Sequence, residues 1–439
     1  GFHTGLINPG AVDPMTCARV GVECGCIEAD PIDAGFIGRF SDLTVVDQVA
    51  WASAYSETYG DLVVGRFDQV AGWVWEWVDG VPADGEIIGA PSGPRGGTED
   101  DGPDVGQYTA IAAGPDGALH VAYYDVDHHA LKYAHGEPRP GGSGHVWMTM
   151  TVDAEGDAGR WSSISVGPDG APGIAYRVAN VNDESQIRYV QANDAAPNAI
   201  GDWAVPLVLQ ARALPDPDPE TGSYPEGTGL FTSQARDPDG RPVVAWYDRT
   251  EGRLWWSRLL DAGFSEPEML AGWGSDVETR DGDMGANVDL IIDAAGNAHL
   301  CFQDGMTDSL RYLAPELGYD EWVDDGVWID TGGRGYAVHI VGDDCNIRLD
   351  ADGNAVIVFQ DATLQALLMR RRNREVANPE ESPWSGRDVL RGATNNYQGA
   401  FGFYASAEVV DGAIWVVHYV YNNQVRPATR TLEFFSEDL

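Results

Sequence analysis

Runs of consecutive apolar residues recur along the chain, each a few residues after a turn glycine. The stretch LHVAYYD (119–125) follows the turn GPDG, and similar stretches occur at 174–178, 244–248, 300–304 and 357–361. Successive apolar positions are typical of a strand that is buried on both faces. Asp-Gly and Asp-x-x-Gly are tight-turn sequences, since Asp bonds to its own turn and Gly accepts a positive φ. The pattern therefore predicts a repeated hairpin with a buried second strand.

The repeat has a steady period. The turn glycines lie 53, 70, 56, 57 and 59 residues apart, at Gly117, Gly170, Gly240, Gly296, Gly353 and Gly412. A weaker copy at 49–67 brings the number to seven. Four strands fit within each period, as in a propeller blade, and seven blades close a ring that leaves few strand edges exposed. We predict an all-β chain with a single seven-bladed β-propeller of four-stranded antiparallel blades at 37–439, and an N-terminal arm at 1–36.

The N-terminal arm and the cysteines give further expectations about how the predicted ring is held together. The last copy has only three strands before the chain ends, so we expect the arm to supply or cover the outer edge of that blade. The arm contains Cys17, Cys24 and Cys26 without a zinc-binding spacing, which favours a disulfide-stapled loop and an extracytoplasmic location. Cys301 and Cys345 fit either two buried small side chains or an inter-blade disulfide. We favour the two buried side chains.

The repeats resemble those of a known group. A turn with Asp and Gly followed by Val-Ala-Tyr-Tyr-Asp (121–125) is similar to the repeats of secreted bacterial β-propellers in the sialidase-like, Asp-box superfamily. The resemblance covers nearly the whole chain after residue 37 and is one of repeat style. The Asp-box motif, Ser-x-Asp-x-Gly-x-x-Trp, is not intact, because SVGPDGAPGIAY (165–176) places its Asp and Gly in another frame. No catalytic residue of sialidases is carried over to this sequence.

Charge narrows the range of partners. The chain has 69 acidic and 27 basic residues, for a net charge of −42. Such a surface repels nucleic-acid phosphates and anionic lipids, so we expect neither as a partner. No run of eighteen apolar residues is present, and we therefore predict no transmembrane segment.

An aspartate follows most of the buried strands. These carboxylates fit either a ring around one channel mouth that holds calcium, which is the one cofactor this pattern suggests, or caps on the turns that follow. We favour caps, because a residue shared by most copies serves what every blade needs. Function is then expected where the copies differ, near the same mouth. The candidate binding residues are Tyr124, Asp125, His128, His129, Arg177, Tyr247, Asp248, Gln303, Asp304, Gln360, Asp361 and Tyr419.

Several segments depart from the repeat. DVDHH (125–129) fits a metal site, acid–base chemistry or, as we favour, an exposed polar loop. The acidic segments 92–106, 215–229 and 274–285 are expected on the same face as solvated loops or a cation-binding rim. RRRNR (370–374) fits a solvated turn better than a docking patch. The alternating tryptophans of WVWEW (73–77) favour packing between blades over sugar stacking.

These features favour a binding or scaffold protein outside the cytoplasm. Its partner would be a surface protein or a glycan met by the acidic, loop-rich face, and the role of a subunit in a cell-surface assembly fits the same features. The sequence lacks a nucleophile with its base, a phosphate cradle and a closed metal site. The alternative is a carbohydrate-active enzyme, either a glycosidase of sialidase-like type or a polysaccharide lyase, with its site at the channel mouth.

Overall fold

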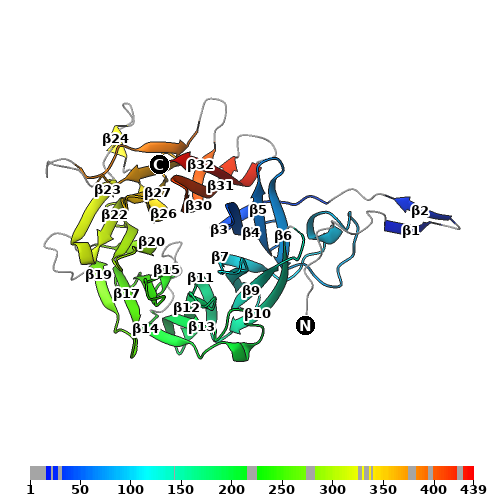
Figure 1. The fold of residues 1–439 in the computed structure, drawn as a ribbon, viewed down its shortest axis with the longest axis horizontal. Helices are drawn as coiled ribbons and strands as arrows, with labels where there is room; N and C mark the ends of the chain where they lie inside the picture. The colour runs from blue at the N-terminus through cyan, green and yellow to red at the C-terminus, as the bar shows by residue number, and fades with distance from the viewer. Residues whose placement is uncertain are drawn as a thin grey trace.

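Seven antiparallel sheets follow one another along the chain and stand around a central channel in the computed structural model (Figure 1). The structure describes residues 32–142, 144–214, 225–272, 282–324, 340–373, 382–393, 399–422 and 429–439. It also describes the backbone of two short hairpins, β1–β2 (Thr16–Val20, Glu23–Ile27) and β24–β25 (Ile329–Asp330, Tyr336–Ala337). The predicted all-β, seven-bladed propeller is confirmed.

Each blade is a meander that begins at the channel. The innermost strands are β3 (Ile37–Val46), β7 (Val105–Ala113), β11 (Asp157–Val166), β15 (Leu230–Arg236), β20 (Met284–Ile292), β26 (Val341–Leu349) and β30 (Ala400–Val410). The second strands are β4 (Val49–Ser56), β8 (Leu119–Asp125), β12 (Pro172–Val181), β16 (Pro242–Asp248), β21 (Ala298–Asp304), β27 (Ala355–Asp361) and β31 (Ala413–Asn422).

The outer half of each blade is less regular. The third strands are β5 (Asp61–Asp68), β9 (Ala130–Pro138), β13 (Glu184–Gln191), β17 (Arg253–Leu260), β22 (Ser309–Ala314), β28 (Ala366–Arg371) and β32 (Thr429–Asp438). The outer strands are β6 (Gly72–Asp79), β10 (His145–Asp153), β14 (Leu207–Ala213), β23 (Tyr319–Asp324) and β29 (Asp388–Arg391), while β18 (Gly263–Phe264) and β19 (Glu268–Gly272) share this position in blade 4. In the connections that the structure describes, three single-turn helices are present: η1 (Pro94–Gly97), η2 (Ile200–Asp202) and η3 (Pro315–Leu317).

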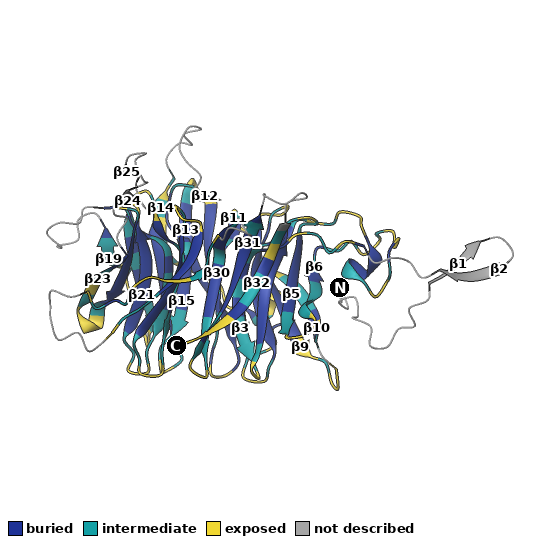
Figure 2. Cartoon of the chain, turned by 90° about the horizontal axis from the view of Figure 1, so that it is seen from above, coloured by how far each residue is buried: buried dark blue, intermediate teal, exposed yellow. Residues whose placement is uncertain are grey.

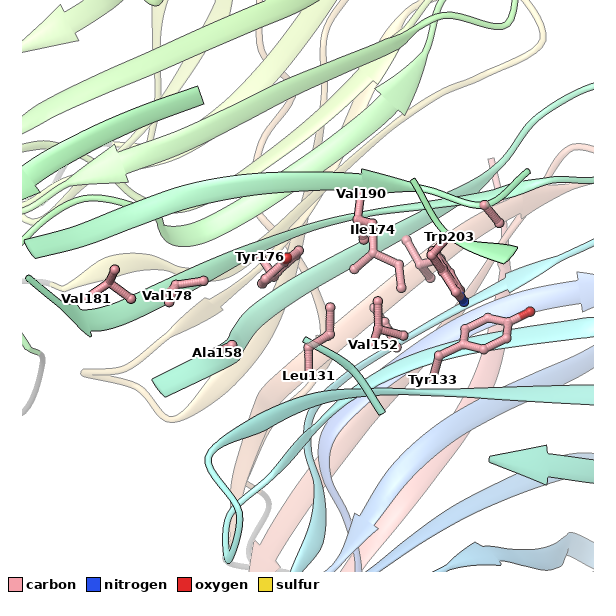
Figure 3. Close-up of a cluster of buried hydrophobic side chains, with 14 residues drawn as sticks. Leu131, Tyr133, Val152, Ala158, Ile174, Tyr176, Val178, Val181, Val190 and Trp203 are labelled. Carbon is pink, nitrogen blue, oxygen red and sulfur yellow. The ribbon is translucent and has the colours of Figure 1, made fainter. Parts of the chain in front are cut away.

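The second strands are buried on both faces, as predicted. Every residue of β8, β16, β21 and β27 is buried, because each of these strands lies between its own neighbours and the adjacent blades. Figure 3 shows one inter-blade layer, in which Leu131 and Val152 of blade 2 meet Ile174 and Tyr176 of blade 3. Burial of this kind, repeated between neighbouring blades, supplies most of the favourable free energy of folding.

The seven innermost strands run in the same direction, so the loops sort onto two faces (Figure 2). We call the face with the glycine-marked turns the turn face. The opposite face has the turns between second and third strands and the connections between blades, and we call it the loop face.

Blade 7 closes against blade 1 without a shared strand among the described residues. β3 contacts β30, β31 and β32. Ser406 Oγ accepts a hydrogen bond from the Leu43 amide at 3.1 Å and donates one to Asp42 at 2.8 Å. Trp73 and Trp75 stack at 5.0 Å and pack with Phe434 of β32, which confirms the predicted inter-blade packing for these two. Trp77 packs against Ile37, Ala54 and Val63 of its own blade. Residues 1–31 lie outside the described side chains, so ring closure and disulfide stapling by the arm stay predictions.

The expectation of two separate buried cysteines is wrong. Cys301 of β21 and Cys345 of β26 form a disulfide that links blades 5 and 6, with their Cα atoms 6.4 Å apart. The innermost strand of each blade packs against the second strand of the preceding blade, which brings these two positions together. The disulfide pairing therefore follows from this packing between neighbouring blades, and the spacing of the two cysteines in the sequence does not determine it.

The arginine cluster is also more engaged than expected. Arg372 donates two hydrogen bonds to Glu321 of blade 5, at 2.9 and 2.7 Å, and Arg370 lies 3.7 Å from Asp324. Arg371 lies 3.5 Å from Asp350 of its own blade. A solvated turn is therefore the wrong description for these three residues, because neighbouring carboxylates neutralise them. Arg374 lies outside the described residues.

Candidate functional site at the channel mouth

Each innermost strand has a bulge near its loop-face end. Seven residues, one per blade, have a left-handed backbone with φ between 47° and 54°: Phe40, Tyr108, Trp161, Phe231, Asn287, Asp344 and Tyr404. At each of them the register of the innermost strand shifts against the second strand. A residue of this kind costs on the order of 1–3 kcal/mol and is concentrated at functional sites in proteins. We call these seven positions the mouth ring.

A glycine two residues earlier makes each bulge possible. Gly106 has φ 107°, and a Cβ atom there would lie 2.8 Å from Leu62 Cα of the preceding blade. Gly159 is in the same relation to Leu131, at 2.8 Å. Only glycine allows the two backbones to approach so closely. The bulge thereby turns the side chain two residues after the glycine toward the channel.

Five adjacent members of the mouth ring are aromatic. Their ring centroids follow one another at 4.9, 4.7, 4.9 and 5.9 Å, in the order Tyr404, Phe40, Tyr108, Trp161 and Phe231. These distances are typical of favourable aromatic pairs. We call this set the aromatic arc. It occupies blades 7, 1, 2, 3 and 4 and lines a channel cavity of about 240 Å³.

The remaining two positions are polar. Asn287 of blade 5 and Asp344 of blade 6 complete the mouth ring, and we call them the polar sector. Asp344 Oδ2 accepts a hydrogen bond from the Tyr404 amide at 2.8 Å, while Asn287 Nδ2 lies 3.4 Å from Asp343 Oδ1. Burial raises the pKa of Asp344 to about 7, opposed by the hydrogen bond from Tyr404 and reinforced by the charge of Asp343.

The polar side chains deeper in the channel hold the ring together. Asp42 accepts a hydrogen bond from the Ile111 amide of the next blade at 2.8 Å, and Asp289 accepts one from the Ile347 amide at 2.9 Å. Ser163 in blade 3 accepts a bond from the Gln234 amide in the same way, at 3.1 Å. These groups satisfy backbone donors of the neighbouring strand, which is a structural role.

The predicted tyrosines lie directly behind the aromatic arc. The rings of Tyr124, Tyr247 and Tyr419 are 6.2, 6.2 and 6.4 Å from those of Tyr108, Phe231 and Tyr404, respectively. Each hydroxyl donates to a carboxylate from a blade connection or a neighbouring blade: Asp157 at 2.6 Å, Asp283, and Glu57 at 3.0 Å. Burial, with these carboxylates, raises the pKa of all three phenols. The tyrosines therefore support the arc from its outer side.

The other predicted residues at this second-strand position bond to backbone. Gln303 and Gln360 donate to the carbonyls of Val341 and Phe401 in the next blade, at 3.1 and 2.6 Å. Arg177 donates to the carbonyls of Thr228 and Glu226 at 3.2 and 3.0 Å, and its guanidinium lies 5.7 Å from the centroid of the Trp161 ring. Burial lowers the pKa of Arg177 to about 10.

The four predicted aspartates cap turns, as favoured from the sequence. Asp125 and Asp361 accept hydrogen bonds from amides three residues later, at 2.9 and 2.8 Å. Asp248 and Asp304 do the same, at 3.2 and 3.3 Å. All four are buried. Among the described residues, no three His, Cys, Asp or Glu side chains gather as a metal site, so calcium stays a prediction.

The two histidines of DVDHH differ in their surroundings. The His128 side chain is 71% exposed and bonds to Asp125 at 3.0 Å. His129 Nδ1 lies 2.9 Å from Tyr124 Oη, which also contacts Asp157 and, at 3.3 Å, Arg160 Nη2. Tyr124, His129, Asp157 and Arg160 thus form one cluster beside Tyr108 of the arc.

The acidic segments are only partly described. In 92–106, Arg95 is buried and pairs with Asp61 at 2.7 Å, so this segment is anchored to blade 1. Burial raises the pKa of Asp61 to about 6 although Arg95 opposes the shift. Residues 215–224 and 273–281 lie outside the described residues. No helix in the described ranges reaches the length and apolarity that crossing a bilayer requires.

The mouth ring itself was not predicted from the sequence. The signal was a three-residue motif in each innermost strand, which consists of a glycine, any residue, and then an aromatic residue, Asn or Asp. The seven copies are GRF (38–40), GQY (106–108), GRW (159–161), GLF (229–231), GAN (285–287), GDD (342–344) and GFY (402–404).

No protein-family model and no curated protein matches the chain, so the Asp-box resemblance stays one of repeat style. Among solved structures, the polysaccharide lyase Uly1 is similar at 10% identity, with a TM-score of 0.49 over 96% of this chain and 94% of that one. A puromycin hydrolase is similar at 15% identity and a TM-score of 0.49, over 93% of this chain and 54% of that one. An α-L-arabinofuranosidase from Fusarium graminearum is similar at 10% identity and a TM-score of 0.41, over 75% and 92%.

Proposed function

We propose that this protein binds a glycan outside the cytoplasm, with one sugar unit at the mouth of the central channel. The aromatic arc is the observation that carries the proposal. Five rings on one side of a cavity offer apolar faces to the C–H faces of a sugar, and the polar sector offers acceptors to its hydroxyl groups. At about 240 Å³ the cavity suits a single ring of a longer ligand.

The location rests on the disulfide. Cys301 and Cys345 are paired within the protein core, and such bonds persist mainly in oxidising compartments. A glycan at a cell surface is then accessible to the protein, and a glycan is one of the two partner classes that the sequence favoured.

Calorimetric titration with a panel of cello-, xylo- and chito-oligosaccharides tests the proposal. Tyr108→Asn places in the arc the residue that blade 5 already uses at this position, so the bulge is retained while the stacking face is lost. We expect Tyr108→Asn to weaken binding about tenfold, the scale of one lost aromatic contact. Phe264→Ala, which removes an aromatic ring from the outer edge of blade 4, serves as the matched control and should bind normally.

A carbohydrate-active enzyme is the second candidate, and the Tyr124 cluster favours it. A phenol that contacts an imidazole, a carboxylate and a guanidinium at once is an arrangement for moving a proton beside a bound sugar. Incubation with the same oligosaccharides, followed by chromatography of the products, tests this candidate. Turnover that Tyr124→Phe and His129→Ala abolish and His128→Ala retains would support an enzyme. Binding without turnover would contradict the enzyme and support the glycan-binding protein.

A further inference from the structure

Among the described side chains, none forms an ion pair with Asp344 of the mouth ring. Where the structure describes side chains, no Lys or Arg nitrogen lies within 4 Å of the Asp344 carboxylate, and its hydrogen bond comes from the Tyr404 amide. Asp42 and Asp289, deeper in the channel, are by contrast fully engaged by backbone amides, Ser406 and Arg348. Asp344 therefore keeps acceptor capacity directed to the cavity that it lines.

The surroundings of Asp344 add negative charge. Asp343 precedes it on β26, and the pKa of Asp343 is raised by burial with a contribution from Asp308. The arginines near the mouth lie on the arc side, and each is already engaged. Arg39 lies 3.9 Å from Glu57, and Arg160 lies 3.3 Å from Asp157. The polar sector is thus an uncompensated acidic edge of the cavity, in a protein of net charge −42.

The order of the blades sets this edge opposite the aromatic arc. The arc is centred on Tyr108 in blade 2, and in a ring of seven the position across from blade 2 falls between blades 5 and 6. Asn287 and Asp344 occupy those blades. Aromatic faces with a carboxylate across from them are the features that bind an organic cation, through the ring quadrupoles and a charge-assisted hydrogen bond.

We propose that the glycan bound at the channel mouth carries a free, positively charged amino group, which Asp344 and Asn287 hold while its sugar ring lies on the arc. The inference rests on the proposed function and specifies its ligand class as an amino sugar. An acylated nitrogen brings no charge to Asp344, and a uronate brings a second carboxylate to the acidic edge. Both should bind more weakly.

Three β-1,4-linked oligomers of equal length test the inference, because they differ at the C2 substituent. We would titrate the full chain near neutral pH and low ionic strength with oligomers of glucosamine, N-acetylglucosamine and glucose. The glucosamine oligomer should bind about tenfold more tightly than the other two. Asp344→Asn, which suits the left-handed backbone and keeps one acceptor oxygen, should abolish the preference for the glucosamine oligomer over the glucose oligomer. Asp411→Asn removes the same charge from an exposed turn on the turn face and should have no effect.

The outcomes separate the two proposals. Equal or weaker binding of the glucosamine oligomer would overturn the inference, whereas binding of the glucose oligomer that Tyr108→Asn weakens would still support glycan recognition. Preference for glucosamine that persists in Asp344→Asn would also overturn it, since general attraction to an acidic protein would then explain the result. Binding of none of the three oligomers would contradict the proposed function and the inference together.

Discussion

At the scale of single residues, the mouth ring uses one backbone conformation for three kinds of side chain. Aromatic residues rarely adopt a left-handed backbone, whereas Asn and Asp adopt it readily. Five aromatic residues nevertheless do so here, and their mutual contacts at 4.7 to 5.9 Å compensate part of the cost. The chain thus accepts local strain at the position where the cavity is lined. Asp344 is a separate case, since its cost is electrostatic.

The raised pKa of Asp344 predicts a stability that depends on pH. An unfolded aspartate titrates near 3.9, whereas burial raises the pKa of Asp344 to about 7 in the folded protein. The folded state therefore holds the proton longer, so the contribution of Asp344 to the free energy of unfolding is most favourable below about pH 4 and is lost as the pH rises through 7. We expect Asp344→Asn to stabilise the protein by roughly 1–3 kcal/mol at about pH 8 and to have little effect at about pH 4. Thermal unfolding followed by circular dichroism measures both, and an equal difference at the two pH values would contradict the assignment.

At the scale of elements, side-chain interactions join each blade to its neighbour, both at the innermost strands and toward the outer edge. The disulfide, the Asp and Ser side chains below the mouth ring and the pair Arg372–Glu321 all cross blade boundaries. These contacts align successive sheets, whereas the strand ladders within each blade are local.

The inter-blade disulfide should contribute measurably to stability. Closing the 44-residue separation between Cys301 and Cys345 constrains the unfolded chain, and such bonds contribute about 2–4 kcal/mol. We expect the double substitution Cys301→Ala, Cys345→Ala to lower the free energy of unfolding by that amount in urea titrations. Reducing agent should destabilise the natural chain to a similar extent and change the stability of the double variant much less.

The contact between blades 7 and 1 predicts a second effect. Ser406→Ala removes one of the two acceptors of the Leu43 amide and one of the donors to Asp42, which should cost about 0.5–1.5 kcal/mol. Ser436→Ala, on the exposed part of β32, should change stability little. Equal urea midpoints for the two variants would show that Ser406 is not needed for ring closure.

The division between interactions within a blade and interactions between blades explains what the sequence could predict. Turn glycines and doubly buried strands are local signals, so the blades, their number and the turn-capping aspartates followed from the residues. The Cys301–Cys345 bond and the pairing of Arg370 and Arg372 depend on which strands are neighbours across blades, and no local pattern carries that information. The mouth ring had a local signal, but the bulge that gives it meaning depends on Leu62, Leu131 and their equivalents in the preceding blades.

At the scale of the whole molecule, net charge opposes folding. With a charge of −42, mutual repulsion of the carboxylates raises the free energy of the compact state. The many Arg–carboxylate pairs across the blades relieve this repulsion only in part, since acidic residues outnumber basic ones by 69 to 27.

Salt should therefore stabilise the protein. Raising NaCl from about 0.01 to about 1 M shortens the Debye length from about 30 to about 3 Å and screens the repulsion between exposed carboxylates. We expect the thermal midpoint to rise by a few degrees, an effect of about 1 kcal/mol or more. KCl at equal ionic strength should reproduce the rise, and a midpoint that falls with NaCl would contradict the prediction.

The glycine-anchored bulges have a consequence for how this protein can diverge. Each blade contributes one side chain to the lining of the cavity, and each of these side chains comes from a different segment of the chain. The side chains that bond to the next blade lie two residues after the mouth-ring position, as Asp42 does after Phe40. A substitution in the mouth ring therefore leaves the contacts between blades intact. Ligand preference in such a ring can change by single steps of mutation, one blade at a time, on an unaltered frame.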